Sequence, residues 1–323
     1  RHTMSGNTSE FHLLAFLIFK EFHMGLSIGV LLMYLLSVIG NMTIIIIVFK
    51  DSQLHTPMYF FLCNLAFQDI VYVSAILPKL LVITVSGNGN ICFQCCITQM
   101  FLFAFCVGIE FFLLTSMAYD RYVAICVPLH YTIIMNKRLC ALLAFSSWFF
   151  AALNSLMHSV LISNLSFCNV QQINHFFCDV KTLLWLSCAD TRNIQLLISV
   201  EGIVLGFIPF LLILISYMYI LSTILKISDA SGRLKAFSSC SSHLIVVVLF
   251  CGTFLSLNLK PEAHHSEEQD KLLSLIYIAV VPALNPLVYS LRNKEVLRAL
   301  KKQFLKKRCG ICWHLIIKEP IVY

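Results

Sequence analysis

The chain has 323 residues, of which 59% are hydrophobic and only 12% are charged, and its formal net charge is +7. So few polar residues cannot cover a soluble globule of this length, so the composition excludes a water-soluble globular protein and predicts a multi-pass membrane protein. The basic excess is accompanied by no nucleic-acid-binding motif, so we expect no nucleic-acid partner.

Seven apolar stretches are long enough for membrane-spanning helices, each of which needs about 20 residues. A membrane β-barrel would need alternating segments of about ten residues, and the sequence has none. We therefore predict an all-α fold, a seven-transmembrane helix bundle over residues 24–291, with an extracellular segment (1–23) before it and a cytosolic tail (292–323) after it. The predicted spans are 24–49, 57–84, 96–125, 139–162, 195–226, 235–258 and 272–291.

The distribution of basic residues predicts the orientation of this bundle. An outside N-terminus places 16 of the 23 Lys and Arg residues on the cytosolic side, nine of them between Arg292 and Lys318. Because cytosolic loops are enriched in Lys and Arg, we expect the N-terminus outside and the C-terminus in the cytosol. The sequon Asn7-Thr8-Ser9 then lies outside, which makes Asn7 a candidate glycosylation site.

The second and third spans each carry one carboxylate near the middle, Asp69 and Glu110. Ionisable groups inside a membrane are costly, so each is a candidate for function. If the two face each other, they could bind a cation, with sodium as the candidate metal, or share a proton. The alternative is a pair of neutral acids that are hydrogen-bonded inside the bundle. We expect no other cofactor.

The third span ends in Tyr119-Asp120-Arg121-Tyr122. Two charges at the end of a membrane helix are costly unless they pair with each other. We therefore expect an ion pair between Asp120 and Arg121 on the cytosolic side, and this pattern favours a switchable contact over simple packing.

Six of the 14 cysteines fall at the predicted outer face, which is oxidising. Disulfides among them are expected to hold down the loop over residues 163–194, which has little core of its own. Six cysteines allow 15 pairings, and the spacing alone does not choose among them. The six are Cys92, Cys95, Cys96, Cys168, Cys178 and Cys188.

The seventh span contains Asn285-Pro286, where the proline removes a backbone hydrogen bond and predicts a kink that can act as a hinge. Residues 293–305 then place apolar side chains on one side and basic ones on the other. This pattern predicts a short amphipathic eighth helix on the cytosolic leaflet, with membrane lipid as its partner.

The sequence contains no H-E-x-x-H, no G-x-S-x-G and no phosphate-binding glycine loop, so we do not expect an enzyme. Two other kinds of membrane protein remain as alternatives to a receptor. One is a non-signalling or decoy seven-helix protein, and the other is a transporter with buried carboxylates, although transporters usually show repeated halves or broken helices.

Five long motifs follow one another along the chain: LHTPMYFFL (54–62), MAYDRYVAIC (117–126), INHFFCD (173–179), KAFSSCSSHL (235–244) and PALNPLVYSLRNKEV (282–296). This set resembles the signature of the vertebrate odorant receptors, which are rhodopsin-like G-protein-coupled receptors, and the resemblance runs from about Glu10 to Leu300. It implies a receptor in the cilia of olfactory neurons. Such a receptor binds a small volatile molecule, activates a stimulatory G protein of the olfactory type and raises cyclic AMP.

The resemblance also implies roles for individual residues. Asp69 with Glu110 resembles the sodium site of the family, and the implied disulfides are Cys96 with Cys178 and Cys168 with Cys188. Two positions depart from the family pattern. Cys251 stands where the family usually has tyrosine, and Cys95 stands where glycine is usual, which with Cys92 leaves another pairing open. The residues implied in activation and G-protein coupling are Asp120, Arg121, Tyr122, Tyr217, Asn285, Pro286 and Tyr289.

The receptor plan places a ligand pocket in the outer half of the third, fifth and sixth spans. Most residues there are apolar, so we expect a small neutral odorant that is held by dispersion and burial. Asn258 is the candidate for a directional hydrogen bond, whereas Glu201 either favours an amine or turns toward a neighbouring helix. The predicted lining is Phe103, Ala104, Val107, Gly108, Glu201, Leu205, Cys251, Phe254, Leu255 and Asn258.

Overall fold

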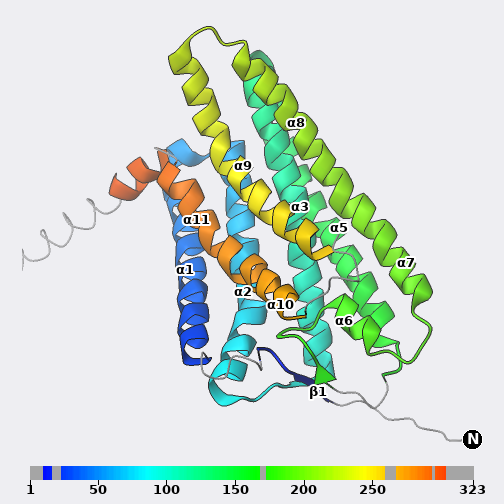
Figure 1. Cartoon of the computed structure of the whole chain (residues 1–323). Coiled ribbons are helices and arrows are strands. Elements are labelled where there is room, and N and C mark those ends of the chain that lie inside the picture. The colour runs from blue at the N-terminus through cyan, green and yellow to red at the C-terminus, as the bar shows by residue number, and fades with distance from the viewer. Residues whose placement is uncertain (1–9, 17–22, 168–171, 259–266, 293–294, 303–323) are drawn as a thin grey trace, which may run out of the picture.

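The computed structural model of the chain is a bundle of long helices with a small sheet at one end (Figure 1). It describes residues 10–16, 23–167, 172–258, 267–292 and 295–302. We call the end that carries strand β1 the sheet end and the opposite end, where α3 finishes, the Arg121 end. The main helices are α1 (His23–Lys50), α2 (Pro57–Ser86), α3 (Phe93–Cys126), α5 (Lys137–Ser163), α7 (Arg192–Glu201), α8 (Ile208–Leu225), α9 (Ala230–Asn258), α10 (Glu267–Leu275) and α11 (Val281–Arg292).

Six helices of the described chain are long and apolar enough to cross a membrane. A seventh is reached when the two parts of α9, which meet at a bend of 40° between Ser238 and Cys240, are taken as one span. The predicted all-α seven-helix bundle is thereby confirmed. The first span agrees with α1 to within one residue at each end, whereas α9 begins five residues before the predicted sixth span.

Two of the spans contain a π-helical segment, which the sequence did not predict. In the fifth span, η4 (Gly202–Phe207) joins α7 to α8, and in the seventh, η6 (Ile276–Val280) joins α10 to α11. A π-helical turn inside an α-helix is rare and is frequently found at functional sites. Pro209 lies two residues after the end of η4, in the first turn of α8.

Local signals set several helix ends. Pro57 occupies the first turn of α2, where a missing backbone N–H costs nothing, and Gly87 ends that helix in the left-handed conformation with φ of 72°. The side chain of Asn136 caps α5 by accepting a hydrogen bond from the Leu139 backbone N–H at 3.0 Å. Short segments connect the spans at the Arg121 end, namely η2 (Ser52–Leu54), η3 (Pro128–His130) and α4 (Tyr131–Ile134).

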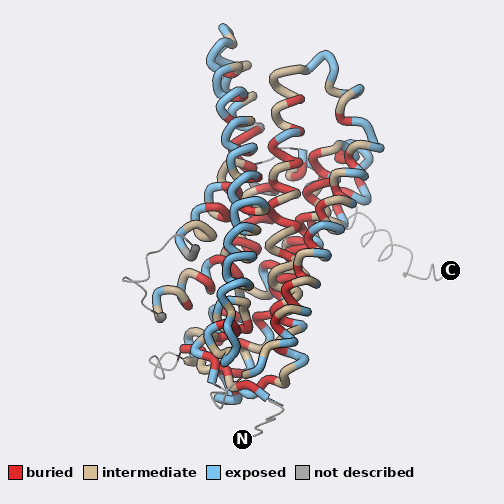
Figure 2. The backbone as a smooth tube through the Cα atoms, turned by 90° about the vertical axis from the view of Figure 1, so that its right-hand side faces the viewer, coloured by how far each residue is buried: buried red, intermediate tan, exposed pale blue. Residues whose placement is uncertain are grey.

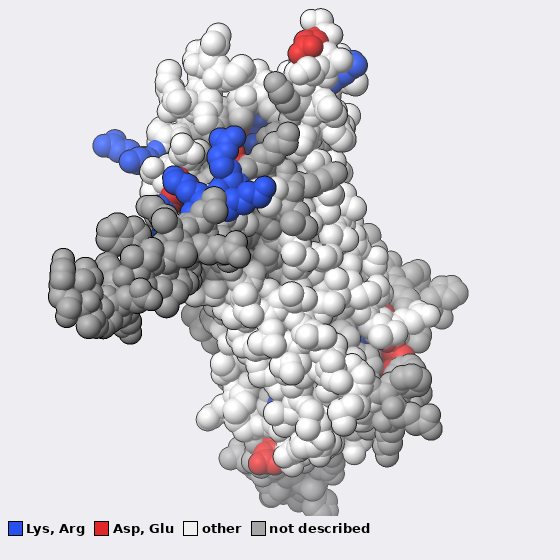
Figure 3. Space-filling view, turned by 90° about the vertical axis from the view of Figure 1, so that its left-hand side faces the viewer, with Lys and Arg blue, Asp and Glu red and all other residues white. Residues whose placement is uncertain are grey.

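Helix α3 is the centre of the bundle and packs against α2, α5, α8 and α9. Buried residues follow the interior of the bundle and exposed ones its periphery (Figure 2). Large apolar side chains remain exposed on the outer faces of the spans, including Leu32, Ile39, Phe145 and Phe149. Lys and Arg gather near the Arg121 end, whereas the middle of the face in Figure 3 is uncharged. Such an exterior suits the hydrocarbon core of a bilayer.

Helix α1 lies close against the proline kink of α11. A Cβ atom added at Gly40 would lie 2.8 Å from the Cβ of Pro286, so only glycine permits this approach. The neighbouring Asn41 side chain donates to the Pro282 carbonyl at 3.2 Å and to the Ser37 carbonyl at 3.0 Å. The first and seventh spans are therefore joined at the predicted hinge.

Three short strands cover the sheet end, and the sequence did not predict them. Their order is β2 (Asn90–Cys92), β1 (Glu10–Leu13) and β3 (Gln172–Ile173), with β1 antiparallel to β2 and parallel to β3. The N-terminal segment is thus the central strand between two loops. Gly89 lies so close to the Leu13 carbonyl that a Cβ atom would not fit there.

The predicted eighth helix is described only in part. Residues 295–302 are helical, and Lys302 Nζ lies 3.4 Å from Asp51 Oδ2 while the Tyr59 hydroxyl donates to Glu295 Oε2 at 2.8 Å. These contacts attach the segment to α2 and to the residue before η2. The rest of the predicted helix, Asn7 and Cys168 lie outside the described residues, so the amphipathic helix and the glycosylation site stay predictions.

Candidate functional site

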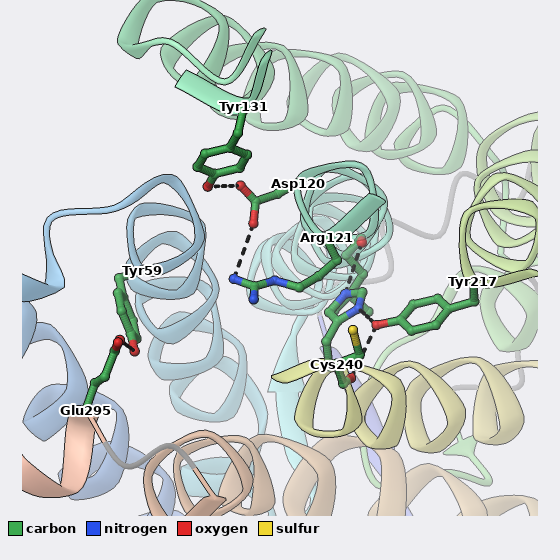
Figure 4. A network of polar contacts seen from close by, with 9 residues as sticks. Tyr59, Asp120, Arg121, Tyr131, Tyr217, Cys240 and Glu295 are labelled. Atoms are coloured by element: carbon green, nitrogen blue, oxygen red, sulfur yellow. Dashed lines mark hydrogen bonds and ion pairs between the residues drawn. The ribbon is translucent and has the colours of Figure 1, made fainter. Parts of the chain in front are cut away.

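A network of polar contacts surrounds the last turns of α3 (Figure 4). One Nη atom of Arg121 lies 3.3 Å from Asp120 Oδ2, so the predicted ion pair forms. The Tyr131 hydroxyl donates to the other carboxylate oxygen of Asp120 at 2.7 Å. Because the Asp120 side chain is fully buried, its charge depends on these two neighbours for stabilisation.

Tyr131 belongs to α4, in the connection between α3 and α5. Burial, together with the adjacent Asp120 carboxylate, raises the pKa of Tyr131 above its ordinary value of 10.0. The hydroxyl therefore stays protonated at neutral pH and acts as a donor. It ties the end of α3 to the loop that follows it.

A second group of contacts joins α8 and α9 to α3 beside this pair. One ring nitrogen of His243, Nε2, lies 3.1 Å from the Leu114 carbonyl, and the other, Nδ1, lies 2.7 Å from the Tyr217 hydroxyl. A carbonyl can only accept, so Nε2 carries the proton and the neutral ring accepts from Tyr217 through Nδ1. The Tyr217 hydroxyl also lies 3.4 Å from the Cys240 carbonyl. The sequence had not assigned His243 to the site.

The other residues implied in activation gather around the same network. The Tyr289 hydroxyl is buried and has no hydrogen-bond partner in the described part of the chain. Since the Tyr217 hydroxyl is directed to His243, neither tyrosine hydroxyl bonds to Arg121. Tyr122 packs edge-to-face on Tyr219, with ring centroids 6.0 Å apart. The structure therefore shows a conformation in which Tyr217 and Tyr289, both implied in activation, do not hydrogen-bond to Arg121.

A buried polar layer lies deeper in the bundle. The Asn285 side chain donates to Asp69 Oδ2 at 2.9 Å, and Glu110 lies within electrostatic reach of Asp69. One oxygen of each carboxylate, Asp69 Oδ1 and Glu110 Oε1, has no hydrogen-bond partner within the described residues. Two unsatisfied carboxylate oxygens fit a hard cation that prefers oxygen ligands. The described residues contain no cluster of three His, Cys, Asp or Glu side chains that would hold a transition metal.

Aromatic side chains form the wall of the predicted ligand region. Phe254 packs edge-to-face on Phe111, with ring centroids 4.9 Å apart, and both lie near Gly206 of η4. Phe103 packs on Phe177 of the loop before α6 (Val180–Trp185), with ring centroids 4.8 Å apart. A Cβ at Gly108 would lie 3.0 Å from Ala151 Cβ, so Gly108 faces α5 and allows the two helices to approach.

Glu201 and Asn258 are the two polar residues predicted to line the ligand region, and the structure describes the side chain of only the first. Glu201 Oε2 lies 2.6 Å from His158 Nε2 of α5, so Glu201 turns toward the neighbouring helix, which was one of the two alternatives. The side chain of Asn258 lies outside the described residues, and its role stays a prediction.

Disulfides join the loops at the sheet end. Cys96 is bonded to Cys178, the pairing that the resemblance implies, and it connects α3 to the loop before α6. Cys92 is bonded to Cys95, which the sequence had left open. Cys188 is also disulfide-bonded, but its implied partner Cys168 lies outside the described residues.

The burial of Lys271 was not predicted from the sequence, in which this residue was only one of the basic residues outside the cytosolic side. Lys271 of α10 is 1% exposed and donates to Asn174 Oδ1 at 2.7 Å and to Glu268 Oε1 at 2.9 Å. Asn174 belongs to the loop that Cys178 anchors. The sheet end of the seventh span is thus joined to that loop by a charged hydrogen bond, and the disulfide joins the same loop to α3.

His175 of the same loop predicts a dependence of stability on pH. Burial lowers the pKa of His175 from its ordinary value of 6.5 to about 4, although Asp179 and Asp270 oppose the shift and Lys271 adds to it. The unfolded chain therefore binds a proton at higher pH than the folded one. The stability that results is complete above about pH 6.5 and is lost as the pH falls toward 4.

We expect the free energy of unfolding of the purified protein to be lower at pH 5 than at pH 7.5 by about 2 kcal/mol because of this residue. His175→Gln should reduce the difference in Tm between the two pH values, whereas His130→Gln, at an exposed residue of the Arg121 end, should not. Thermal unfolding at both pH values measures this, and an unchanged difference in His175→Gln contradicts it.

Comparisons with known proteins identify the family. The olfactory receptor family profile matches residues 30–307. Human olfactory receptor 13F1 is 48% identical over 288 residues, which cover 89% of this chain and 90% of the relative. Mouse olfactory receptor 1E16 is 46% identical over 278 residues (86% and 88%), and gorilla olfactory receptor 1G1 is 47% identical over 294 residues (91% and 94%).

The chain therefore belongs to the olfactory receptor family of G-protein-coupled receptors. It is an odorant receptor and not an enzyme. As a member of this family with several membrane-spanning helices, it is a multi-pass protein of the plasma membrane.

Proposed function

We propose that this receptor binds a small neutral odorant between α3, the η4–α8 segment and α9, and activates a stimulatory G protein of the olfactory type. The sheet end is extracellular and the Arg121 end is cytosolic, since the described basic residues gather near the latter. Activation raises cyclic AMP, and the site of action is the cilium of the olfactory neuron. Membrane lipid surrounds the apolar exterior.

The observation that carries this proposal is the closed contact of Asp120, Arg121 and Tyr131 at the end of α3. A buried carboxylate with two partners on different elements has a second arrangement available when those elements move apart. Release of Arg121 would leave its guanidinium at the cytosolic opening of the bundle, where a G protein binds. A ligand that favours the open arrangement shifts the population toward it.

The aromatic side chains of Phe254, Phe111 and Phe103 support the proposed odorant-binding site. We expect Phe254→Ala to reduce sensitivity to an agonist about tenfold, since covering this partly buried ring with a ligand contributes about 1.5 kcal/mol of apolar burial. Glu201→Gln should leave sensitivity within about twofold, because Glu201 is engaged by His158.

Cyclic AMP dose responses in transfected cells measure both variants. Equal sensitivity of Phe254→Ala and the unmodified receptor would place the ligand elsewhere. A large loss in Glu201→Gln would instead favour a ligand amine. A protein that reaches the surface but never raises cyclic AMP would support the non-signalling alternative.

The Asp69 and Glu110 pair is the proposed sodium site; Asn285 and Asn41 are polar neighbours of Asp69, and Gln68 is a polar neighbour of Glu110. A bound cation would neutralise the carboxylates and stabilise the folded bundle. We expect the purified receptor to have a higher Tm in sodium chloride than in choline chloride of equal concentration, by a few degrees. Asp69→Asn and Glu110→Gln should remove this difference, and its persistence in both variants contradicts the site.

A further inference from the structure

Unsatisfied polar atoms gather on one side of the predicted ligand region. Both amide atoms of Gln68, the hydroxyls of Tyr72 and Tyr277, and Glu110 Oε1 are buried with no partner at full hydrogen-bond distance in the described chain. Their longer polar contacts are with each other, Tyr72 with Tyr277 and Gln68 with Glu110. Gln68, Tyr72 and Tyr277 are 0%, 1% and 2% exposed. Buried polar groups are nearly always paired, so such a concentration calls for a partner that is not part of the chain.

These groups come from three spans and lie close together. The rings of Tyr72 in α2 and Tyr277 in η6 meet edge-to-face, with centroids 5.9 Å apart, and both hydroxyls lie within electrostatic reach of Glu110 in α3. The π-helical segment η6 carries Tyr277. A rare backbone conformation that buries a tyrosine among unpaired polar groups is more typical of a binding site than of simple packing.

The cluster adjoins the predicted ligand lining directly. Tyr72 packs on Phe103, with ring centroids 5.9 Å apart, and Tyr277 packs on Phe250, with ring centroids 5.4 Å apart. The buried thiol of Cys251 lies within electrostatic reach of Glu110. The polar cluster is therefore in direct contact with the aromatic side chains of the predicted ligand region.

We propose that this cluster, which we call the tyrosine subsite (Gln68, Tyr72, Glu110 and Tyr277), recognises a hydroxyl group on the odorant. The proposal rests on the proposed function and specifies its ligand as an alcohol or a phenol. A hydroxyl oxygen accepts from the Gln68 amide or a tyrosine hydroxyl, while its hydrogen is donated to Gln68 Oε1, which leaves Glu110 Oε1 to the proposed cation.

Other polar groups match the subsite less well. An ammonium group has no acceptor and would leave the Gln68 amide N–H groups and the tyrosine donors unpaired. A ligand carboxylate would be buried beside the carboxyl group of Glu110. An ether or ketone accepts but cannot donate, so Gln68 Oε1 would stay without a donor. The hydroxyl group alone among these serves both kinds of unpaired atom.

Thermal stabilisation of the purified full-length receptor in lipid nanodiscs tests the proposal without a signalling step. The probes are primary alcohols from pentanol to decanol, each with the methyl ether, the alkane and the primary amine of equal heavy-atom count. We expect an alcohol to raise Tm more than its three counterparts. Tyr72→Phe and Tyr277→Phe keep the aromatic rings. Each should weaken the affinity for the alcohol about three- to tenfold, which corresponds to the loss of one hydrogen bond.

Tyr34→Phe is the matched control, because the Tyr34 hydroxyl contacts Ser74 of α2 away from the cluster. It should keep the preference for the alcohol. The proposal is overturned if all four kinds of probe stabilise the receptor equally, if none does, or if the amine is preferred. It is also overturned if the preference for the alcohol survives in both subsite variants. If internal water alone pairs these atoms, the Phe variants change the Tm of the ligand-free receptor and leave probe selectivity unchanged, which also overturns it. A receptor that binds alcohols in this way but raises no cyclic AMP contradicts the proposed coupling and leaves the subsite in place.

Discussion

Arg121→Ala is expected to abolish odorant-stimulated cyclic AMP production while surface delivery continues. The substitution removes the guanidinium that lies 3.3 Å from Asp120, so the closed contact loses its cation and the open state loses the group proposed to meet the G protein. The loss should exceed 100-fold in signalling efficacy, because losing a buried charged contact between the open state and the G protein costs about 3 to 5 kcal/mol. Ligand binding at the sheet end should change little.

Tyr131→Phe is the companion variant for this test. It removes only the hydroxyl that donates to Asp120 at 2.7 Å and leaves Arg121 in place. The closed state should weaken by about 1.5 to 3 kcal/mol, the value of a hydrogen bond to a charged group, so basal cyclic AMP should rise. Normal cyclic AMP responses in Arg121→Ala at equal surface expression would disprove the role given to the pair.

The second large effect concerns the disulfide between Cys96 and Cys178. Replacing both residues by serine should reduce surface expression severely, because this bond joins segments 82 residues apart and its loss costs roughly 2 to 5 kcal/mol. Losing it also releases the loop that carries Asn174, which binds the buried Lys271. Flow cytometry of epitope-tagged receptor on intact cells measures the result.

The matched control replaces Cys92 and Cys95 by serine. These residues are only three apart, so their bond restrains the unfolded chain far less and its removal should leave most of the surface expression. If both double variants are delivered equally well, the disulfide between α3 and the loop is not the main restraint at the sheet end.

The sequence predicted the spans well because each depends on local composition. Continuous apolar runs bounded by residues such as Pro57 and Gly87 define helices without knowledge of their neighbours. The ion pair of Asp120 and Arg121 could be predicted for a similar reason, since adjacent opposite charges at a membrane helix end have few other partners. The disulfide of Cys96 with Cys178 followed from the family resemblance, because six cysteines alone allow too many pairings.

The features that the sequence missed depend on contacts between distant segments. Strand β1 forms only because Glu10–Leu13 lies between β2 and β3, and four residues carry too weak a pattern to predict it. The role of His243 depends on Leu114 and Tyr217, which come from two other helices. Lys271 was treated as an ordinary outer charge, because burial by the loop of Asn174 has no local signal.

The tyrosine subsite could not be predicted for the same reason. Tyr72 and Tyr277 are separated by most of the chain, and a tyrosine in a membrane helix is usually an ordinary interior or interfacial residue. Only the packing of α2 against η6 shows that their hydroxyls are buried without partners.

Ligand-dependent cyclic AMP production tests the central claim most directly. The receptor should be expressed in cells that lack the stimulatory Gα subunit, with and without reintroduction of the olfactory form, and exposed to a broad odorant panel that includes alcohols. We predict that at least one odorant raises cyclic AMP only when the Gα subunit is restored. Two results would contradict the proposed function. In one, the receptor is confirmed at the surface but no odorant of the panel raises cyclic AMP; in the other, the response does not need the Gα subunit.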